Sequence, residues 1–415
     1  MFKLRIPTLL SAFITLLNDR LGETIVFPLL PFLLERFTSN GSTLGLLAGT
    51  YAISQFSVAP LIGALSDRFG RKPVMITCVA GSVLGLSLFA ITVSINWNNF
   101  LPLWGSSIPL ICLFIARIID GASGGTAATA TAILADISTP ETRAKTFGLI
   151  GVAFGLGFVL GPGLGTALAQ FNVVLPVWVA TCFAITNLCL VIWVLPETLI
   201  QKNRQILPRK RELNPFTQLK LVFKNPLSKE LCLAFFIFFM AFNGFTAVLV
   251  LYLKEAFEWS PGLSSQAFVV VGVVAMVVQG GLIGPLVNKF GEWRLTITGT
   301  GFVISGCLLI TLATKENSIP LVFTAVAVLA MGTGLVTPCL RALISKRLND
   351  AGQGAVLGSL QGLQSLGTFL GATAAGLSYD LLGQKSPFLG ATLLLFTVIF
   401  LTSNHKSQRY MGTKV

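Results

Sequence analysis

Five ionisable side chains lie inside long apolar stretches of the sequence, where they are the residues best suited to chemistry. Asp19, Arg20 and Glu23 share one stretch, and Arg117 and Asp120 share another. A charged group at the centre of a lipid bilayer costs roughly 2.5–3.5 kcal/mol, so each is a candidate functional residue. Asp19 and Glu23 are four residues apart and share one face of a helix. Two neighbouring carboxylates in a medium of low dielectric constant suit the reversible binding of a proton.

This pattern predicts that Asp19 or Glu23 binds a proton and that Arg117 tunes that carboxylate or competes for it. At 1.5 Å per residue, Asp19 is about 18 Å from one edge of its expected helix, and Arg117 is about 15 Å from the opposite edge. In a hydrocarbon core about 30 Å thick these depths agree, so Asp19 and Arg117 are able to meet. The alternative is a static cluster in which i,i+3 ion pairs join Arg20 to Glu23 and Arg117 to Asp120.

The composition is that of a membrane protein. Of the 415 residues, 53% are hydrophobic and 11% are charged, whereas a typical soluble domain has roughly 25% charged residues. Apolar runs of about 20 residues, long enough to cross the hydrocarbon core, recur from end to end. We expect an all-α integral membrane protein with about twelve spans, near 7–35, 43–65, 73–95, 107–135, 144–170, 173–195, 230–253, 263–288, 294–314, 319–346, 352–382 and 387–403.

The basic residues predict the orientation of these spans. If both termini lie on one side, the loops and span edges of that side hold 23 of the 29 Lys and Arg, Arg341 among them. Positive loops stay in the cytoplasm, so we expect both termini there, in a plasma membrane of bacterial type. The net charge of +13 is spread over short segments, which disfavours nucleic acid as a partner. The first apolar run is long and carries charges, so we expect a span and not a signal peptide.

A basic, proline-containing segment divides the chain. We expect a six-helix half at 1–195, a cytoplasmic linker at 196–229, a second six-helix half at 230–403 and a cytoplasmic tail at 404–415. All five ionisable residues expected within spans belong to the first half. We therefore expect proton handling in the first half and much of the substrate wall in the second.

Two motifs repeat between the halves. GALSDRFG at 63–70 corresponds to GPLVNKFG at 284–291, and three glycines of the fifth span recur 210 residues later as Gly358, Gly367 and Gly371. Like-oriented halves of this kind place the substrate between them, near the middle of the membrane.

Three segments resemble major facilitator drug:proton antiporters, particularly the tetracycline-efflux branch. They are YAISQFSVAPLIGALSDRFGRKP at 51–73, RIIDG at 117–121 with ADISTPETR at 135–143, and GFVLGPGLG at 157–165. The resemblance is dense over residues 16–165 and thinner to residue 380. It implies two pseudo-symmetric six-helix bundles that work by alternating access. A monomer is sufficient for that mechanism, and we expect no cofactor or metal.

The resemblance also implies roles for particular residues. Asp67 would meet the eleventh span, and Arg71 would pair with Asp136; the alternative is that these charges only orient the loop. The conformational switch implied by the motif comprises Gly63, Asp67, Arg68, Gly70, Arg71, Lys72 and Asp136, with the glycines permitting close approach and a tight turn. The antiporter signature comprises Gly157, Gly161, Pro162 and Gly165, for which plain helix packing is an equal alternative.

Asp19 falls on the family's acidic residue in the first span, and Glu23 is an addition. The polar candidates for the substrate cavity are Asn18, Tyr51, Gln55, Asn243, Gln279, Gln361 and Gln364. Phenylalanines of the seventh span suit an apolar substrate, or belong to the core or a lipid-facing surface. The third and ninth spans lack the acids of the tetracycline exporters, so a neutral or cationic hydrophobic compound is more consistent with the sequence than a metal–tetracycline chelate.

We therefore expect proton-coupled antiport that exports small amphipathic or hydrophobic compounds. The alternative is a proton- or gradient-linked carrier of a specific metabolite such as a sugar or organic solute, which needs a more polar cavity. An enzyme is not expected, because the single histidine, His405, lies in the tail and the seven cysteines include no CxxC pair.

Overall fold

The computed structural model describes residues 5–97, 107–138, 143–199, 214–224, 226–347 and 353–411, together with 201 and 204. Every regular element in these ranges is helical. The chain forms two compact units, of which unit 1 holds residues 1–39, 50–213 and 260–269, and unit 2 holds 40–49, 214–259 and 270–415. The division at 213/214 falls inside the expected linker, and each unit also takes a short piece from the other half of the sequence.

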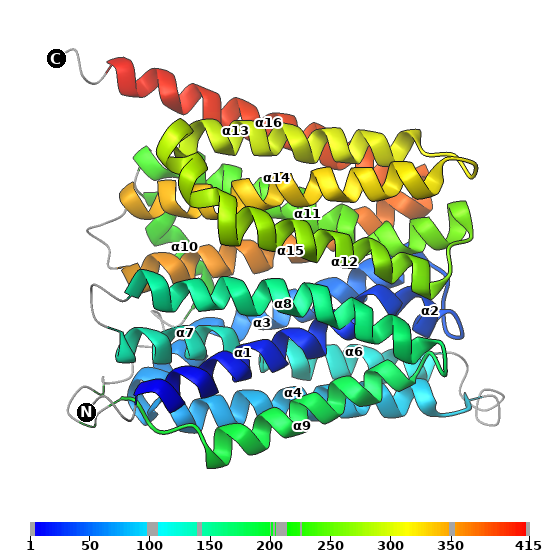
Figure 1. Ribbon diagram of the computed structural model, residues 1–415, viewed down its shortest axis with the longest axis horizontal. Coiled ribbons are helices and arrows are strands. Elements are labelled where there is room, and N and C mark those ends of the chain that lie inside the picture. The colour runs from blue at the N-terminus through cyan, green and yellow to red at the C-terminus, as the bar shows by residue number, and fades with distance from the viewer. Residues whose placement is uncertain are drawn as a thin grey trace. The chain divides into compact units, whose positions relative to one another are not determined.

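Unit 1 is built on two central helices. α1 packs against α8 and α9, and α4 packs against α6 and α9 (Figure 1). The helices of this unit are α1 (Arg5–Val26), η2 (Phe27–Leu29), α2 (Leu30–Leu34), most of α3 (Gly41–Phe69), α4 (Arg71–Ser94), α6 (Ser107–Ala122), α7 (Thr126–Ile137), α8 (Arg143–Ala169) and α9 (Leu175–Trp193).

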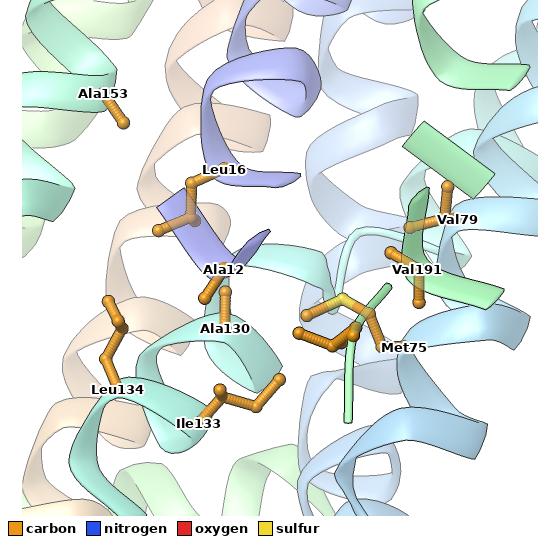
Figure 2. Close-up of a cluster of buried hydrophobic side chains, with 10 residues drawn as sticks. Ala12, Leu16, Met75, Val79, Ala130, Ile133, Leu134, Ala153 and Val191 are labelled. Carbon is orange, nitrogen blue, oxygen red and sulfur yellow. The ribbon is translucent and has the colours of Figure 1, made fainter. Parts of the chain in front are cut away.

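A cluster of small and branched apolar side chains holds these helices together (Figure 2). Ala12 and Leu16 of α1 meet Met75 of α4, Ile133 of α7 and Val191 of α9, all fully buried. Lipid tails are as apolar as these side chains, so close van der Waals packing, and not exclusion from water, favours the association.

Unit 2 is arranged around α11 and α13. α11 packs against α15 and α16, while α13 packs against α14 and α16 (Figure 1). Its helices are α10 (Pro215–Lys224), α11 (Pro226–Phe257), α12 (Pro261–Val277, whose first residues belong to unit 1), the π-helical turn η5 (Val278–Leu282), α13 (Ile283–Leu312), α14 (Ser318–Arg347), α15 (Gln353–Leu382) and α16 (Ser386–Met411).

The described helices are long enough for twelve membrane crossings. Eight described segments are long and apolar enough to span a bilayer, and one of them, Pro261–Leu312, has 52 residues, enough for two crossings that turn at Gly291. At 1.5 Å per residue, α1, α8 and α15 also exceed the hydrocarbon thickness of about 30 Å. The expected all-α membrane architecture is confirmed.

Some expected spans differ in detail. The first bends through η2 and α2, which contain Pro28 and Pro31, because proline lacks a hydrogen-bond donor and disturbs a helix. The fourth breaks at 123–125 into α6 and α7, whereas α8 continues through Pro162. The expected linker contains the amphipathic helix α10, and α16 extends to Met411 inside the expected tail.

The internal repeat is visible in both backbone and packing. Gly70 and Gly291 end the two repeated motifs, and both have a positive φ, at 112° and 77°, which glycine adopts without strain. Gly367 and Gly371 of α15 lie so close to α11 that a Cβ atom would lie 3.0 and 2.0 Å from its main-chain oxygens. The matching glycines of α8, Gly157 and Gly161, lie equally close to α1, although their nearest neighbours there are side-chain atoms.

Candidate transport site

α1 carries a compact group of three charges. The Arg20 guanidinium donates from Nη2 to Asp19 Oδ2 at 2.8 Å and forms a second ion pair with the Glu23 carboxylate. The Asp19 and Arg20 side chains are 17% and 13% exposed, whereas Glu23 is 43% exposed. Two carboxylates therefore share one cation, which leaves one negative charge uncompensated in the group.

Glycines of α8 pack against the turn of α1 that holds these charges. A Cβ atom on Gly157 would lie 2.7 Å from Arg20 Cβ, and one on Gly161 would lie 2.0 Å from Thr24 Oγ1. Thr24 donates its hydroxyl to the main-chain oxygens of Arg20 at 2.7 Å and Gly157 at 2.8 Å. Gly165 is equally close to α1. The glycines of the span-five motif therefore pack closely against α1, as the packing alternative predicts. The motif also contacts the charged group of α1 directly.

A second ion pair lies on α6. Arg117 Nη1 is 3.5 Å from Asp120 Oδ2, and the guanidinium carbon lies 4.7 Å from the centre of the Tyr51 ring, a cation–π contact. Gln55 donates from Nε2 to Gly124 O at 3.1 Å, at the break between α6 and α7. Tyr51 and Gln55, both expected to line the substrate cavity, thus lie against the charged segment of α6 and its break.

Both i,i+3 pairs of the static alternative are present, and the meeting of Asp19 with Arg117 that the depths allow is not seen as a direct ion pair. Asp19 pairs with Arg20, and Arg117 pairs with Asp120. Within the described part of the chain, Asp19 and Arg117 form no ion pair with each other. The two residues were matched by depth alone, and depth leaves the rotation of each helix about its axis open. Each residue instead finds a nearer partner on its own helix.

The remaining polar candidates have varied surroundings. Asn18 and Gln361 are partly buried. Asn243 donates from Nδ2 to Phe239 O at 3.0 Å, within its own helix. Gln279 lies in the π-helical turn η5 and is exposed. In the described residues, none of these four side chains forms a hydrogen bond with a charged side chain, in contrast to Gln364.

Gln364 of α15 accepts a hydrogen bond from Arg341, which the sequence placed with the cytoplasmic charges. Arg341 lies in α14, six residues before the helix ends at Arg347, and its Nη2 donates to Gln364 Oε1 at 2.6 Å. The second half therefore also contains a partly buried ionisable residue, in addition to the five expected within the spans of the first half. Long basic side chains near a helix end commonly extend toward water, whereas this one turns inward.

The phenylalanines of α11 form the core of unit 2. Phe235, Phe238, Phe239 and Phe245 are at most 5% exposed. The ring of Phe239 contacts those of Phe235 and Phe238, and Phe245 reaches Phe388 of α16 with a centroid separation of 6.1 Å. Of the three possibilities, the core alternative is confirmed for these four side chains, whereas Phe242 of the same helix is only partly buried.

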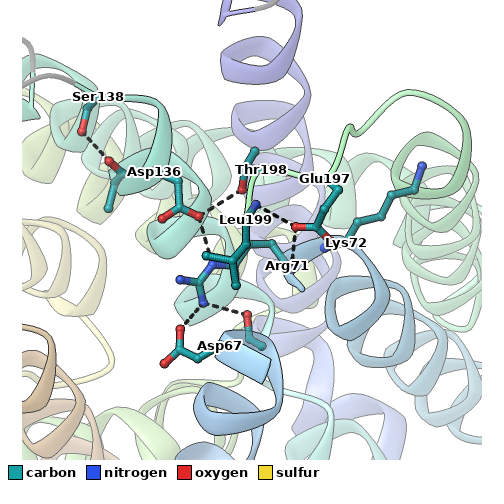
Figure 3. Close-up of polar contacts among 10 residues, drawn as sticks. Asp67, Arg71, Lys72, Asp136, Ser138, Glu197, Thr198 and Leu199 are labelled. Atoms are coloured by element: carbon teal, nitrogen blue, oxygen red, sulfur yellow. Dashed lines mark hydrogen bonds and ion pairs between the residues drawn. The ribbon is translucent and has the colours of Figure 1, made fainter. Parts of the chain in front are cut away.

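Arg71, the first residue of α4, organises the loop between α3 and α4. Its guanidinium donates from Nε to Asp136 Oδ2 at 3.0 Å and from Nη1 to Asp67 Oδ1 at 2.5 Å (Figure 3). Nη1 also donates to Ser66 Oγ at 3.1 Å. The pairing of Arg71 with Asp136 that the resemblance implied is present, and Gly70 forms the expected tight turn.

Gly63 and Arg68 take less part in this cluster. A Cβ atom on Gly63 would have no neighbour within 4 Å among the described residues, so the close approach expected there is absent. Arg68 is exposed, and its guanidinium carbon lies 5.2 Å from the centre of the Phe69 ring. The contact of Asp67 with the eleventh span stays a prediction.

Glu197 completes the cluster and was not anticipated. Its carboxylate accepts the main-chain N–H groups of Arg71 at 2.9 Å and Lys72 at 3.2 Å (Figure 3). These belong to the first turn of α4, where unpaired N–H groups favour an anion. Thr198, the next residue, donates from Oγ1 to Asp136 Oδ2 at 3.1 Å. The tripeptide Pro-Glu-Thr at 196–198 repeats that at 140–142, a sequence signal that could have identified it.

The fold and these intramembrane charges define a multi-pass membrane transporter, a class that the comparisons with known proteins support. The chain is 32% identical over 360 residues to the tetracycline resistance protein, class C, of Escherichia coli, covering 86% of each chain. It is 29% identical over 394 residues to multidrug resistance protein 2 of Bacillus subtilis, covering 94% of this chain and 92% of that protein.

The crystal structure of the human organic anion transporter MFSD10 superposes with a TM-score of 0.73 at 25% sequence identity, covering 96% of this chain and 99% of that one. The family model described as Major Facilitator Superfamily matches residues 12–372 and, overlapping them, 282–409. The chain therefore belongs to the major facilitator superfamily. Its relatives are membrane transporters and not enzymes.

Proposed function

We propose that the protein is a proton-coupled antiporter that exports small amphipathic compounds by alternating access. The observation that carries the proposal is the charge group of α1, in which Asp19 and Glu23 share the single cation Arg20. Binding one proton removes the uncompensated negative charge, so the group has two protonation states that differ by one charge inside the membrane. The names of the relatives from Escherichia coli and Bacillus subtilis favour export of drug-like compounds.

In this proposal the glycine contacts of α8 communicate the protonation state. Gly157 packs on Arg20 and accepts a hydrogen bond from Thr24, so a change in the pairing of Arg20 alters the packing between α1 and α8. The cluster of Arg71 with Asp67 and Asp136 holds the ends of the loop between α3 and α4 in one state of the transport cycle. It rearranges when the transporter changes to its other state.

The proposed setting is a bacterial inner membrane, with both termini in the cytoplasm. The distribution of basic residues supports this orientation, because positive loops stay in the cytoplasm. A monomer is sufficient for the mechanism, and the partners are the transported compound, protons and the lipid bilayer.

A second candidate function is a gradient-linked carrier of one class of organic solute. The name of the human relative, an organic anion transporter, favours it. The two candidates differ in whether protons move against the substrate and in how many kinds of compound are carried.

Purified protein in proteoliposomes with an imposed pH gradient tests the proposal. We expect a proton gradient directed toward the cytoplasmic side to drive substrate the opposite way, and Asp19→Asn or Glu23→Gln to abolish that coupling. Glu316→Gln is the matched control, because Glu316 is an exposed acid outside the charge group. Proton-driven movement of substrate in the same direction as the protons, or coupling intact in both variants, would overturn it.

A further inference from the structure

Arg341 is a partly buried cation of α14 with no acidic partner in the described part of the chain. Its Nη2 donates to Gln364 Oε1 at 2.6 Å, and no described carboxylate forms an ion pair with it. Its Nε atom is fully buried and, among the described residues, makes no hydrogen bond. Glu292 of α13 is paired with Lys346, whose side chain is 66% exposed. The guanidinium is thus left with one neutral acceptor.

The side chain of Arg341 reaches toward a residue of α15 that is further from the helix ends than Arg341 itself. α14 ends at Arg347 and α15 begins at Gln353, so these two helix ends lie on the same side. Arg341 is six residues from that end, about 9 Å, whereas Gln364 is eleven residues from the start of α15, about 16 Å. The hydrogen bond between them therefore runs toward the deeper position, which is the opposite of a basic side chain reaching for water.

The pair presents several donors without acceptors. Arg341 Nε and Nη1 and Gln364 Nε2 donate to no group in the described residues, while Gln364 Oε1 is already occupied by Arg341. A partly buried charge needs a counter-charge, and a guanidinium offers paired N–H donors that match the two oxygens of a carboxylate. An anionic group bound here would supply both the charge and the acceptors.

We propose that Arg341 and Gln364 form a subsite for the anionic group of the transported compound. The substrate class is then small amphipathic anions, above all carboxylates with an apolar body. The proposal rests on the proposed function for the direction and the driving force of transport. Binding of an anion at the subsite does not depend on that function. A static strut between α14 and α15 is the competing explanation, and it predicts no preference for anions.

The test measures binding to the purified full-length protein as a ligand-induced rise in the thermal unfolding midpoint. The probes are naphthoate and its uncharged amide, naphthamide, which have the same apolar body. We expect naphthoate to act at a concentration lower by about tenfold or more, because a hydrogen-bonded charge pair contributes more than a neutral one. Arg341→Gln should abolish this preference, Arg341→Lys should keep part of it, and Arg294→Gln, which removes an exposed arginine of α13, should leave it unchanged.

Three results would overturn the subsite: no carboxylate preference in the unmodified protein, a preference that survives Arg341→Gln, or an equal loss of both probes in that variant. Arg341-dependent binding of naphthoate without any proton-driven transport would instead reject the proposed function and leave the subsite standing. Proton-driven export of neutral compounds alone, with Arg341→Gln fully active, would retain the function and reject the subsite.

Discussion

Asp380, near the end of α15, caps the first turn of α3. Its Oδ1 accepts the main-chain N–H of Gly41 at 2.8 Å, and its Oδ2 accepts that of Ser42 at 2.8 Å, with the Ser42 hydroxyl also donating to Oδ2. All three residues belong to unit 2, whereas the later turns of α3 belong to unit 1. A residue of the second sequence half thus fixes the start of a helix that continues into the other unit.

The first prediction concerns this cap. Asp380→Ala should lower the free energy of unfolding by about 0.5–2 kcal/mol, because the N–H groups of Gly41 and Ser42 lose their acceptor. Asp380→Asn should lose less, since its amide oxygen still accepts one bond. The measurement is the thermal unfolding midpoint in detergent; equal midpoints for the alanine variant and the unmodified protein would show that the cap adds no stability.

The second prediction concerns the glycines of α8. Gly157→Ala and Gly161→Ala should each destabilise the protein by about 1–3 kcal/mol, because the new methyl groups meet Arg20 Cβ at 2.7 Å and Thr24 Oγ1 at 2.0 Å. Gly163→Ala is the control in the same helix, since a Cβ there has no described neighbour within 4 Å. Unfolding midpoints check the difference, and a loss at Gly163 as large as at Gly157 would contradict the packing argument.

The third prediction concerns the shared cation of α1. Arg20→Gln leaves Asp19 and Glu23 without a counter-charge, so one of them should stay protonated throughout the cycle. Substrate exchange between the two sides should then continue, while accumulation driven by a pH gradient is lost; Arg20→Lys should retain part of the coupling. Exchange and gradient-driven accumulation, measured in the same proteoliposomes, separate the two effects, and full coupling in Arg20→Gln would reject the role.

The architecture was predictable because it depends on composition and periodicity. Apolar length determined the spans, and the glycine spacing of 63–70 and 284–291 marked two turns that both contain a glycine of positive φ. Contacts between side chains were less accessible. The sequence contains Arg341 and Glu197, yet whether each reaches water or a partner depends on helix rotation and loop path, which the pattern leaves open. For the same reason, depth allowed Asp19 and Arg117 to meet but could not show that each pairs with a residue of its own helix.

The fourth prediction concerns Glu197, whose carboxylate accepts the first two N–H groups of α4. Glu197→Ala should destabilise the protein by about 0.5–2 kcal/mol through loss of this cap. Asp136→Asn weakens the pairing with Arg71. The double variant should lose less stability than the sum of the two single variants, because both changes act on the same turn. A double-mutant cycle on the unfolding midpoint measures the coupling, and strict additivity would show that the two contacts are independent.

The last prediction follows from combining the proton antiport with the anionic subsite at Arg341. If one carboxylate leaves the cytoplasm for each proton that enters, every cycle moves two elementary charges, whereas a neutral compound moves one. A membrane potential that is negative on the cytoplasmic side assists both movements. At 100 mV, each charge multiplies the equilibrium concentration ratio by about 50-fold, so the potential should raise naphthoate accumulation far more than naphthamide accumulation. Potassium gradients with valinomycin set the potential in proteoliposomes, and a response equal for the two compounds would exclude this stoichiometry with an anionic substrate.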